Sequence, residues 1–172
     1  MANPTLDDDF ESEWSVADPR SRGCRTGPGD GRPPIIHPDA RIGNTAEWIS
    51  RTTGEDPVEI GPNSVVRAFA TIDAGVERPT VIGRDCLVMT HAYVAHDVQT
   101  GDRVQIGPSS VIGGCVTIGH DVKIGLNVTI LPWRTVGDGA RIGAGAVVTK
   151  NIPAGEVWAG NPARRLVKDD DA

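Results

Sequence analysis

The sequence predicts an all-β protein, a parallel β-solenoid whose coils are assembled from six-residue repeats. Three observations lead to this prediction. Ile or Val occupies eleven of the twelve positions that follow one another in steps of six from Ile82 to Val148. The next residue is Gly in eight of these twelve repeats. No segment keeps a 3.6-residue period over a helical length, which excludes the usual alternation of strands and helices.

Each repeat predicts a short strand and a turn, with the residue of the six-step series, here called the anchor, pointing into the core. The Gly after the anchor is expected to supply backbone conformations that other residues resist. Four places after the anchor, mostly small or β-branched residues complete the interior: Cys86, Ala92, Val98, Val104, Ser110, Val116, Val122, Val128, Arg134, Ala140, Ala146 and Ile152. Arg134 is the exception, and Pro132, Trp133 and Arg134 indicate either a functional or interface site or a simple bulge.

An earlier series shares the period in another phase, at Ile36, Ile42, Trp48, Ile60, Val66 and Ile72. The phase changes by four between this series and Ile82, which predicts a loop near residues 74–80. A second loop is expected near residues 50–57. We therefore predict one continuous solenoid from Ile36 to Ile152 with two outward loops.

The two ends differ from the repeat domain, which we place at residues 35–166. Residues 1–34 are acidic and rich in Pro and Gly, a composition suited to a disordered arm. Capping of the open end of the solenoid is the alternative role for this arm. Residues 167–172 are expected to form a solvated acidic tail.

Composition argues against several classes of partner. The 172-residue chain has a net charge of −6, whereas nucleic acids and anionic membranes require a basic surface. No apolar stretch approaches the roughly 20 residues of a membrane span, and the acidic N-terminus is unlike a signal peptide. The three cysteines have no CxxC spacing, which disfavours a disulfide framework or a zinc ribbon and favours a cytoplasmic location.

The C-terminal run GAGAVVTKNIPAGEVWAGNPARRL, residues 143–166, resembles the terminal signature of hexapeptide-repeat acyltransferases. The resemblance implies a left-handed, three-sided β-helix in which each hexapeptide stacks on the third one before it, and a homotrimer that binds acetyl-CoA at its last coils. It places backbone contacts to the pantetheine arm at Ala144, the nucleotide end near Thr149 and Lys150, and phosphate contacts at Arg164. The alternative is that this run only terminates the solenoid.

Residues 58–115 resemble the core of the UDP-N-acetylglucosamine O-acyltransferases of lipid A synthesis, through VEIGPNSVVRAFATID and VIGRDCLVMTHAYVAHDV. The resemblance implies that His96, in the A-H-D triplet, is the general base and that the N–H of Gly114 is the oxyanion donor. Asp73 and Tyr93 occupy positions at which that family has substrate-contacting histidines, and Cys115 replaces another. These departures make a lipid A acceptor and a long-chain carrier-protein donor less expected than the core chemistry.

The residues alone also favour a site at His96. It lies two places after the anchor Val94, on the outward side of its repeat, where a neutral imidazole can accept a proton near pH 7. Either Asp97 or Asp73 can orient its ring, and an ordinary exposed histidine is the alternative. Cys115 lies one coil up and one place along on the same face, but nothing basic in sequence lowers its pKa, which disfavours a nucleophile.

Three roles stay open for His91: substrate contact, metal binding and a plain surface position. Its five-residue spacing from His96 resembles the metal-binding pair of γ-class carbonic anhydrases. Asp73, one coil's length before His91 in sequence, would then complete a two-histidine, one-carboxylate set. No metal is expected in the preferred interpretation, and His120 is interpreted as a surface residue.

We therefore expect a trimeric acyltransferase that moves an acetyl or short acyl group from a CoA thioester to the hydroxyl or amine of a sugar. The acceptor is expected to be an amino sugar or a nucleotide-linked sugar, with both N- and O-acylation open. A γ-carbonic anhydrase-like metalloprotein and a non-catalytic trimeric scaffold are the two alternatives from other classes.

Overall fold

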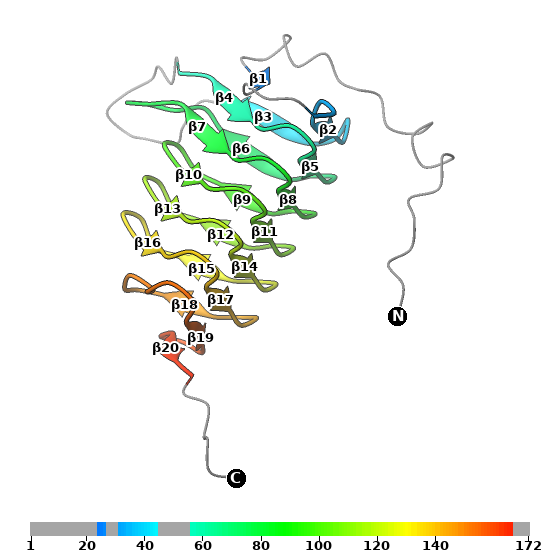
Figure 1. Cartoon of the computed structure of the whole chain (residues 1–172). Helices are drawn as coiled ribbons and strands as arrows, with labels where there is room; N and C mark the ends of the chain where they lie inside the picture. Colours follow the sequence, from blue (N-terminus) through cyan, green and yellow to red (C-terminus); the bar gives the residue numbers. More distant parts are fainter. Residues whose placement is uncertain (1–23, 27–30, 45–55, 167–172) are drawn as a thin grey trace, which may run out of the picture.

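The computed structural model describes residues 24–26, 31–44 and 56–166, which form a stack of coils with no α-helix in these ranges (Figure 1). Three parallel sheets make the three sides of the stack, with one antiparallel pair at its C-terminal end. Sheet A contains β1 (Cys24–Thr26), β4 (Val58–Ile60), β7 (Thr80–Ile82), β10 (Gln99–Thr100), β13 (Thr117–Ile118) and β16 (Thr135–Val136). Sheet B contains β2 (Ile35–Ile36), β5 (Val65–Val66), β8 (Leu87–Val88), β11 (Gln105–Ile106), β14 (Lys123–Ile124), β17 (Arg141–Ile142), β19 (Val157–Ala159) and β20 (Arg164–Arg165). Sheet C contains β3 (Arg41–Asn44), β6 (Thr71–Asp73), β9 (Tyr93–Val94), β12 (Val111–Ile112), β15 (Thr129–Ile130) and β18 (Val147–Val148).

From β1 to β18 the chain visits sheets A, B and C in turn, so each coil has three corners, here named A–B, B–C and C–A after the sheets that they join. Most coils contain three hexapeptides, as the pairing of Gln105 in β11 with Lys123 in β14 shows. The predicted stacking of each hexapeptide on the third one before it is therefore confirmed. The all-β, left-handed β-helix of hexapeptide repeats expected from the sequence is the fold of the described chain.

Several paired strands, including β2 with β5 and β5 with β8, are separated by more than 18 residues, and the extra residues in these two pairs mark two inserted loops. Val65 of β5 pairs with Leu87 of β8, four places beyond the regular partner Gly83, and the extra residues lie at the C–A corner between β6 and β7. This confirms the predicted loop, here called the corner loop, residues 74–79. Ile35 pairs with Val65, again well beyond the regular spacing, so the second insertion falls between β3 and β4. Most of that predicted loop lies outside the described residues.

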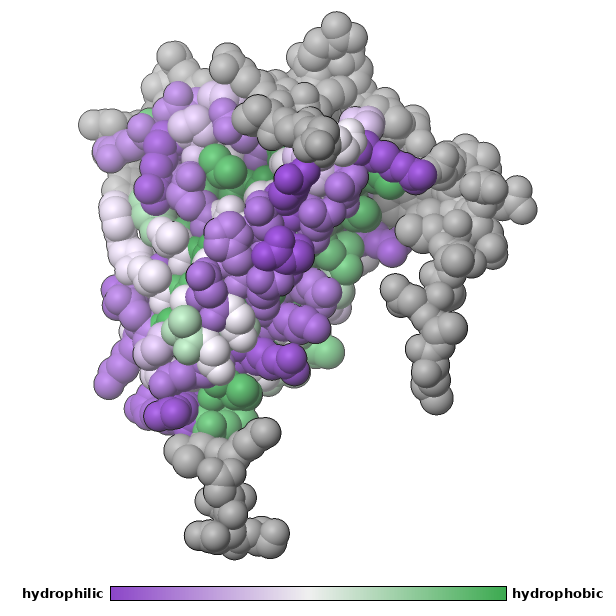
Figure 2. Space-filling model, in the orientation of Figure 1, coloured by the Kyte–Doolittle hydropathy of each residue, from purple (hydrophilic) through white to green (hydrophobic). Residues whose placement is uncertain are grey.

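Every anchor from Ile82 to Val148 is buried, and so is each residue four places further on apart from Arg134. The aliphatic residues thus fill the interior as the periodicity predicts. The described surface in Figure 2 is largely hydrophilic, as expected when the apolar residue of each strand points inward. The PWR segment is no bulge, because Thr117 and Ile118 pair with Thr135 and Val136 without a change of register.

The glycines after the anchors have a different role from the one predicted. None of these eight has a positive φ among the described residues. A Cβ on Gly107 would lie 2.3 Å from the carbonyl oxygen of Gly125 on the next coil, so the absent side chain permits close backbone approach. Positive φ occurs two places later and is carried mostly by residues with side chains, such as Asp97 and Cys115, both at 60°.

Both ends of the solenoid have distinct pairing. β1 lies within the expected N-terminal arm, yet it pairs parallel with β4 and so begins sheet A. The rest of residues 1–30 and the acidic tail, residues 167–172, lie outside the described residues. At the other end β20 turns back antiparallel to β19, and Ala163 is buried beneath this turn. No helix long and apolar enough to cross a membrane occurs in the part of the chain that the structure describes.

We expect Ile118→Ala to lower the free energy of unfolding by about 2–5 kcal/mol, because Ile118 is only 1% exposed at mid-stack and its truncation leaves a cavity. Thr117→Ala is the matched control, since Thr117 is exposed on the same strand and its change should stay within about 0.5 kcal/mol. Chemical denaturation followed by circular dichroism measures both. Equal losses in the two variants would contradict the inward assignment of the anchors.

Candidate functional site

The candidate site centres on a histidine–aspartate pair at the C–A corner after β9. Nδ1 of His96 lies 3.0 Å from Oδ2 of Asp97. The His96 side chain is 12% exposed and that of Asp97 is 4% exposed, so both are largely removed from water while the imidazole keeps an accessible edge. The structure thus gives Asp97 the ring-orienting role that the sequence left open between Asp97 and Asp73.

The corner loop fixes the other oxygen of this carboxylate. Oδ1 of Asp97 accepts hydrogen bonds from the backbone N–H groups of Val76, Glu77 and Arg78, at 2.8, 3.1 and 3.2 Å. The Arg78 guanidinium donates to the carbonyl oxygen of Asp97 through Nε and Nη2. Burial by itself would raise the pKa of Asp97, but the hydrogen bonds from His96 and from the three N–H groups hold that pKa below its ordinary value. Asp97 is therefore ionised at neutral pH.

An ionised Asp97 decides which imidazole nitrogen acts as a base. A carboxylate only accepts hydrogen bonds, so Nδ1 of a neutral His96 carries the proton and donates it to Oδ2. Nε2 then keeps its lone pair and can take a proton from an attacking group. The pair is thereby arranged for general base catalysis.

Gly114 lies directly beside this basic nitrogen. A Cβ at Gly114 would come within 2.6 Å of Nε2 of His96, so any larger residue would force the imidazole to move. Among the described residues the N–H of Gly114 has no hydrogen-bond acceptor. The proposed base and an uncommitted backbone donor therefore stack on each other in successive coils.

Cys115 follows Gly114 and contacts the same carboxylate. Its Sγ lies 3.8 Å from Oδ2 of Asp97. Burial, together with the negative charge of Asp97, raises the pKa of the Cys115 thiol above its ordinary value. The thiol is thus protonated at neutral pH, which agrees with the prediction that Cys115 is a poor nucleophile.

A pocket of about 330 Å³ opens beside this cluster. Asp97 and Cys115 line it together with Glu77 and Arg78 of the corner loop and the 63% exposed Trp133. The phase slip in the sequence signalled the loop, but it gave no sign that the loop would hold Asp97 or line a pocket. The sequence marks Trp133 only as part of the irregular PWR segment.

Asp73 and Tyr93, both predicted to contact substrate, meet each other. The Tyr93 hydroxyl donates a hydrogen bond to Oδ2 of Asp73, and Asp73 is 3% exposed. They project from β6 and β9 on sheet C, the strands that lead into the C–A corner. Their contact with a substrate stays a prediction.

His91 lies apart from this site within one chain. It occupies the B–C corner between β8 and β9, where it is exposed and stacks on Phe69 with ring centroids 5.0 Å apart. Within the described ranges, the only cluster of three or more possible ligands is His96, Asp97 and Cys115. The His91, His96 and Asp73 set considered from the sequence is therefore not assembled within one chain. His120 is exposed, as interpreted from the sequence.

The predicted donor-binding residues fall on different corners. Thr149 and Lys150 lie at the C–A corner, and Lys150 belongs to the same column of stacked positions as His96 and Gly114. Three coils separate Lys150 from His96, which corresponds to about 14 Å. Ala144 lies at the B–C corner, and Arg164 projects from the exposed β20. One chain thus brings Thr149 and Lys150 to the His96 corner but not Ala144.

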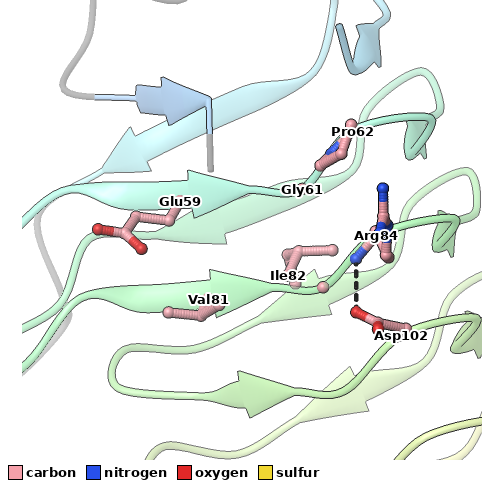
Figure 3. A pocket seen from close by; sticks show the side chains of 8 residues that line it. Glu59, Gly61, Pro62, Val81, Ile82, Arg84 and Asp102 are labelled. Atoms are coloured by element: carbon pink, nitrogen blue, oxygen red, sulfur yellow. Dashed lines mark hydrogen bonds between the residues drawn. The ribbon is translucent and has the colours of Figure 1, made fainter. Parts of the chain in front are cut away.

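A second pocket, of about 300 Å³, lies at the A–B corner (Figure 3). It is lined by residues of β4 and β7 and by the following turns, and the backbone N–H of Arg84 donates to Oδ1 of Asp102 at 3.0 Å across it. No residue of the His96 cluster lines this pocket. This pocket is therefore separate from the His96 site at the C–A corner.

The repeat itself matches a known family. The sequence model described as bacterial transferase hexapeptide (six repeats) matches residues 79–114, 97–132 and 115–150. Residues 79–150 are hexapeptide repeats of the bacterial transferase type. The hexapeptide assignment made from periodicity is therefore confirmed.

Relatives and solved structures agree with this assignment. A UDP-3-O-acylglucosamine N-acyltransferase from a Caulobacter species is 36% identical over 118 residues, covering 69% of this chain and 33% of the relative. Among solved structures, a variant of perosamine N-acetyltransferase from Caulobacter crescentus, in complex with CoA and GDP-perosamine, is 26% identical with a TM-score of 0.69, covering 81% of this chain and 59% of that one. A UDP-N-acetylglucosamine acyltransferase from Bacteroides fragilis is 29% identical with a TM-score of 0.77, covering 84% and 56%. The chain spans between about a third and a half of the length of the curated relatives reported for it.

The thiol of Cys115 provides a measure of the charge on Asp97. Because burial and Asp97 both raise its pKa above 9.0, we expect alkylation of Cys115 by iodoacetamide to be slow at pH 8 and to accelerate only above pH 9. Asp97→Asn removes the charge but not the burial, so the pH–rate curve should shift to lower pH. Peptide mass spectrometry follows Cys115, with the buried Cys86 as internal control. An unshifted curve would contradict the coupling between the thiol and Asp97.

Proposed function

We propose that the protein is an acyltransferase that moves an acetyl or short acyl group from a CoA thioester to the hydroxyl or amine of a sugar or nucleotide-linked sugar. The observation that carries the proposal is the His96–Asp97 pair, whose basic nitrogen lies beside Gly114. The hexapeptide transferase repeats and the acyltransferases among the relatives support the same chemistry.

In the proposed reaction, Nε2 of His96 takes the proton of the acceptor's O–H or N–H as that atom attacks the thioester carbon. Asp97 stabilises the resulting imidazolium through Nδ1. The N–H of Gly114 donates to the oxygen that becomes negative in the tetrahedral intermediate. When the intermediate collapses, the carbon–sulfur bond breaks, and the departing CoA sulfur receives the proton from His96. No group on the protein forms a covalent intermediate.

The donor site in this proposal lies between neighbouring subunits. Ala144 is on the B–C corner, whereas Thr149 and Lys150 are on the C–A corner, so one extended CoA molecule meets both when corners of two copies face each other. A closed cyclic assembly repeats this contact at each interface, and we propose a homotrimer. The phosphates of CoA then face Lys150 and Arg164, both of which are exposed.

The acceptor class is proposed from the relatives and from the polar residues at the site. The similar structure from Caulobacter crescentus contains GDP-perosamine, and the similar enzyme from Bacteroides fragilis is named for UDP-N-acetylglucosamine. Asp73, Tyr93 and Cys115 are the proposed acceptor contacts around His96, and His91 is a proposed contact from a neighbouring subunit. A CoA donor and the sequence composition together suggest a cytoplasmic location.

If His96 is the general base, His96→Ala should reduce turnover by about 10²-fold or more while the affinity for CoA stays nearly constant. The reason is that proton abstraction stabilises the transition state and not the bound donor. His120→Ala is the matched control, because His120 also pairs with an aspartate, Asp102 at 3.7 Å, but lies at the A–B corner. Acyl transfer is measured across a panel of amino sugars and nucleotide-linked sugars. Equal turnover of the wild type and His96→Ala on a true acceptor would refute the mechanism.

Lys150→Ala and Arg164→Ala should each weaken CoA binding by about 1–3 kcal/mol, because each removes a charge-assisted contact to phosphate. Lys123→Ala serves as control, since Lys123 is an exposed lysine on sheet B outside the proposed donor site. Calorimetric titration with CoA gives the affinities, and circular dichroism monitors folding. If both variants retained wild-type affinity, the C-terminal run would serve only to terminate the solenoid.

A further inference from the structure

Three side chains that can bind a metal ion lie together at the C–A corner. The ligand atoms of His96, Asp97 and Cys115 all lie within 4.8 Å of one another. Nδ1 of His96 is 3.0 Å from Oδ2 of Asp97, and Sγ of Cys115 is 3.8 Å from the same oxygen. An imidazole nitrogen, a carboxylate oxygen and a thiol sulfur are the three ligand types that zinc prefers, and three protein ligands leave its fourth position open.

Two of the three separations between these ligand atoms are close to those of a tetrahedral zinc site. With the usual zinc–ligand bond lengths, the nitrogen and oxygen ligands of such a site lie roughly 3.4 Å apart, and the sulfur and oxygen ligands roughly 3.6 Å. The two observed separations differ from these values by only a few tenths of an ångström. The His96 and Cys115 ligand atoms lie within 4.8 Å of each other, and rotation of their side chains would bring them to the roughly 3.6 Å of a zinc-bound nitrogen–sulfur pair.

Asp97 is held in the orientation that such a site requires. The three N–H groups of the corner loop occupy Oδ1 and leave Oδ2 facing His96 and Cys115. The pocket lined by Asp97, Cys115 and Trp133 lies beside two of the three ligands. A carboxylate that its own hydrogen bonds orient, with a pocket beside it, is a feature expected of a metal site.

We propose that His96, Asp97 and Cys115 form an inhibitory site for a borderline-soft divalent cation, with Zn²⁺ as the preferred ion. The site is distinct from a cofactor site, because the proposed transfer reaction needs no metal. The inhibition, though not the binding, rests on the proposed function of His96.

Proton positions explain why the ion would inhibit. Zn²⁺ takes the lone pair of Nδ1, so the single proton of the neutral imidazole moves to Nε2. Nε2 then has no lone pair for the acceptor, and His96 can no longer act as a base. Cys115 binds as the thiolate and releases its proton to solvent. Metal binding thus converts the catalytic tautomer of His96 into an inactive one.

Cobalt and zinc binding test the site without reference to activity. Co²⁺ added to the full-length wild type should give the visible bands of a tetrahedral ion and a near-ultraviolet thiolate band, both displaced by Zn²⁺. Cys115→Ser should abolish the thiolate band, and both Cys115→Ser and His96→Ala should weaken Zn²⁺ binding at least ~10-fold by calorimetry. His120→Ala is the control, and its affinity should equal that of the wild type. Mg²⁺, a hard cation, should not compete.

Inhibition is then measured as the acyl transfer rate relative to each variant's own metal-free rate. The zinc concentration for half inhibition should match the dissociation constant in the wild type and rise at least ~10-fold in Cys115→Ser. Zinc affinity unchanged in both Cys115→Ser and His96→Ala would overturn the site, and binding at this site without inhibition would overturn the inhibitory role. A wild type with no transferase activity would remove the proposed function and the inhibition with it, whereas the cobalt spectrum would still decide the site.

Discussion

The register between successive coils is the constraint on which the rest of the structure depends. Parallel pairing places each strand over the equivalent strand of the coil before it, as in the pairing of Val111 with Thr129. A one-residue slip would turn the buried anchors outward, so the aliphatic core and the register enforce each other. Because the strands cannot lengthen without such a slip, extra residues can enter only at the corners. The corner loop is one such insertion, and it lies next to the proposed catalytic pair.

This register also makes the site possible. His96 and Gly114 occupy equivalent positions in successive coils, so the ladder itself places a base beside a backbone donor without any special local structure. The inserted corner loop adds what the regular repeat lacks. It gives Asp97 three backbone N–H donors, which stabilise its negative charge despite burial and so fix the tautomer of His96. The regular repeat thus positions His96 beside Gly114, and the corner loop stabilises the charge of Asp97.

The sequence predicts the fold nearly completely because one period governs it. The buried anchors, the stacking of His96 on Gly114 and the position of the corner loop all follow from counting in sixes. The six-residue period does not predict the path of an inserted loop, because the contacts of a loop depend on its own backbone conformation. The choice of Asp97 as partner of His96 therefore came only from the structure. The separation of His91 from His96 was accessible to counting, since a step of five in a six-residue repeat leads to the next corner.

The role expected of the glycines was wrong, because the positive φ of each regular turn falls two places after them. The strained corner position has φ near 60° and recurs at every regular turn, at a cost of about 1 kcal/mol for a residue with a side chain.

Asp97 and Cys115 occupy this position, but so do Arg103 and Asp121 on the A–B corner, which form an exposed ion pair at 2.7 Å. Strain therefore belongs to the fold and does not distinguish the site. The C–A corner differs because Asp97 stacks on Cys115 of the next coil there, and His96 lies beside both. In this fold, the best guide to function is therefore the set of side chains that the register places next to one another in successive coils.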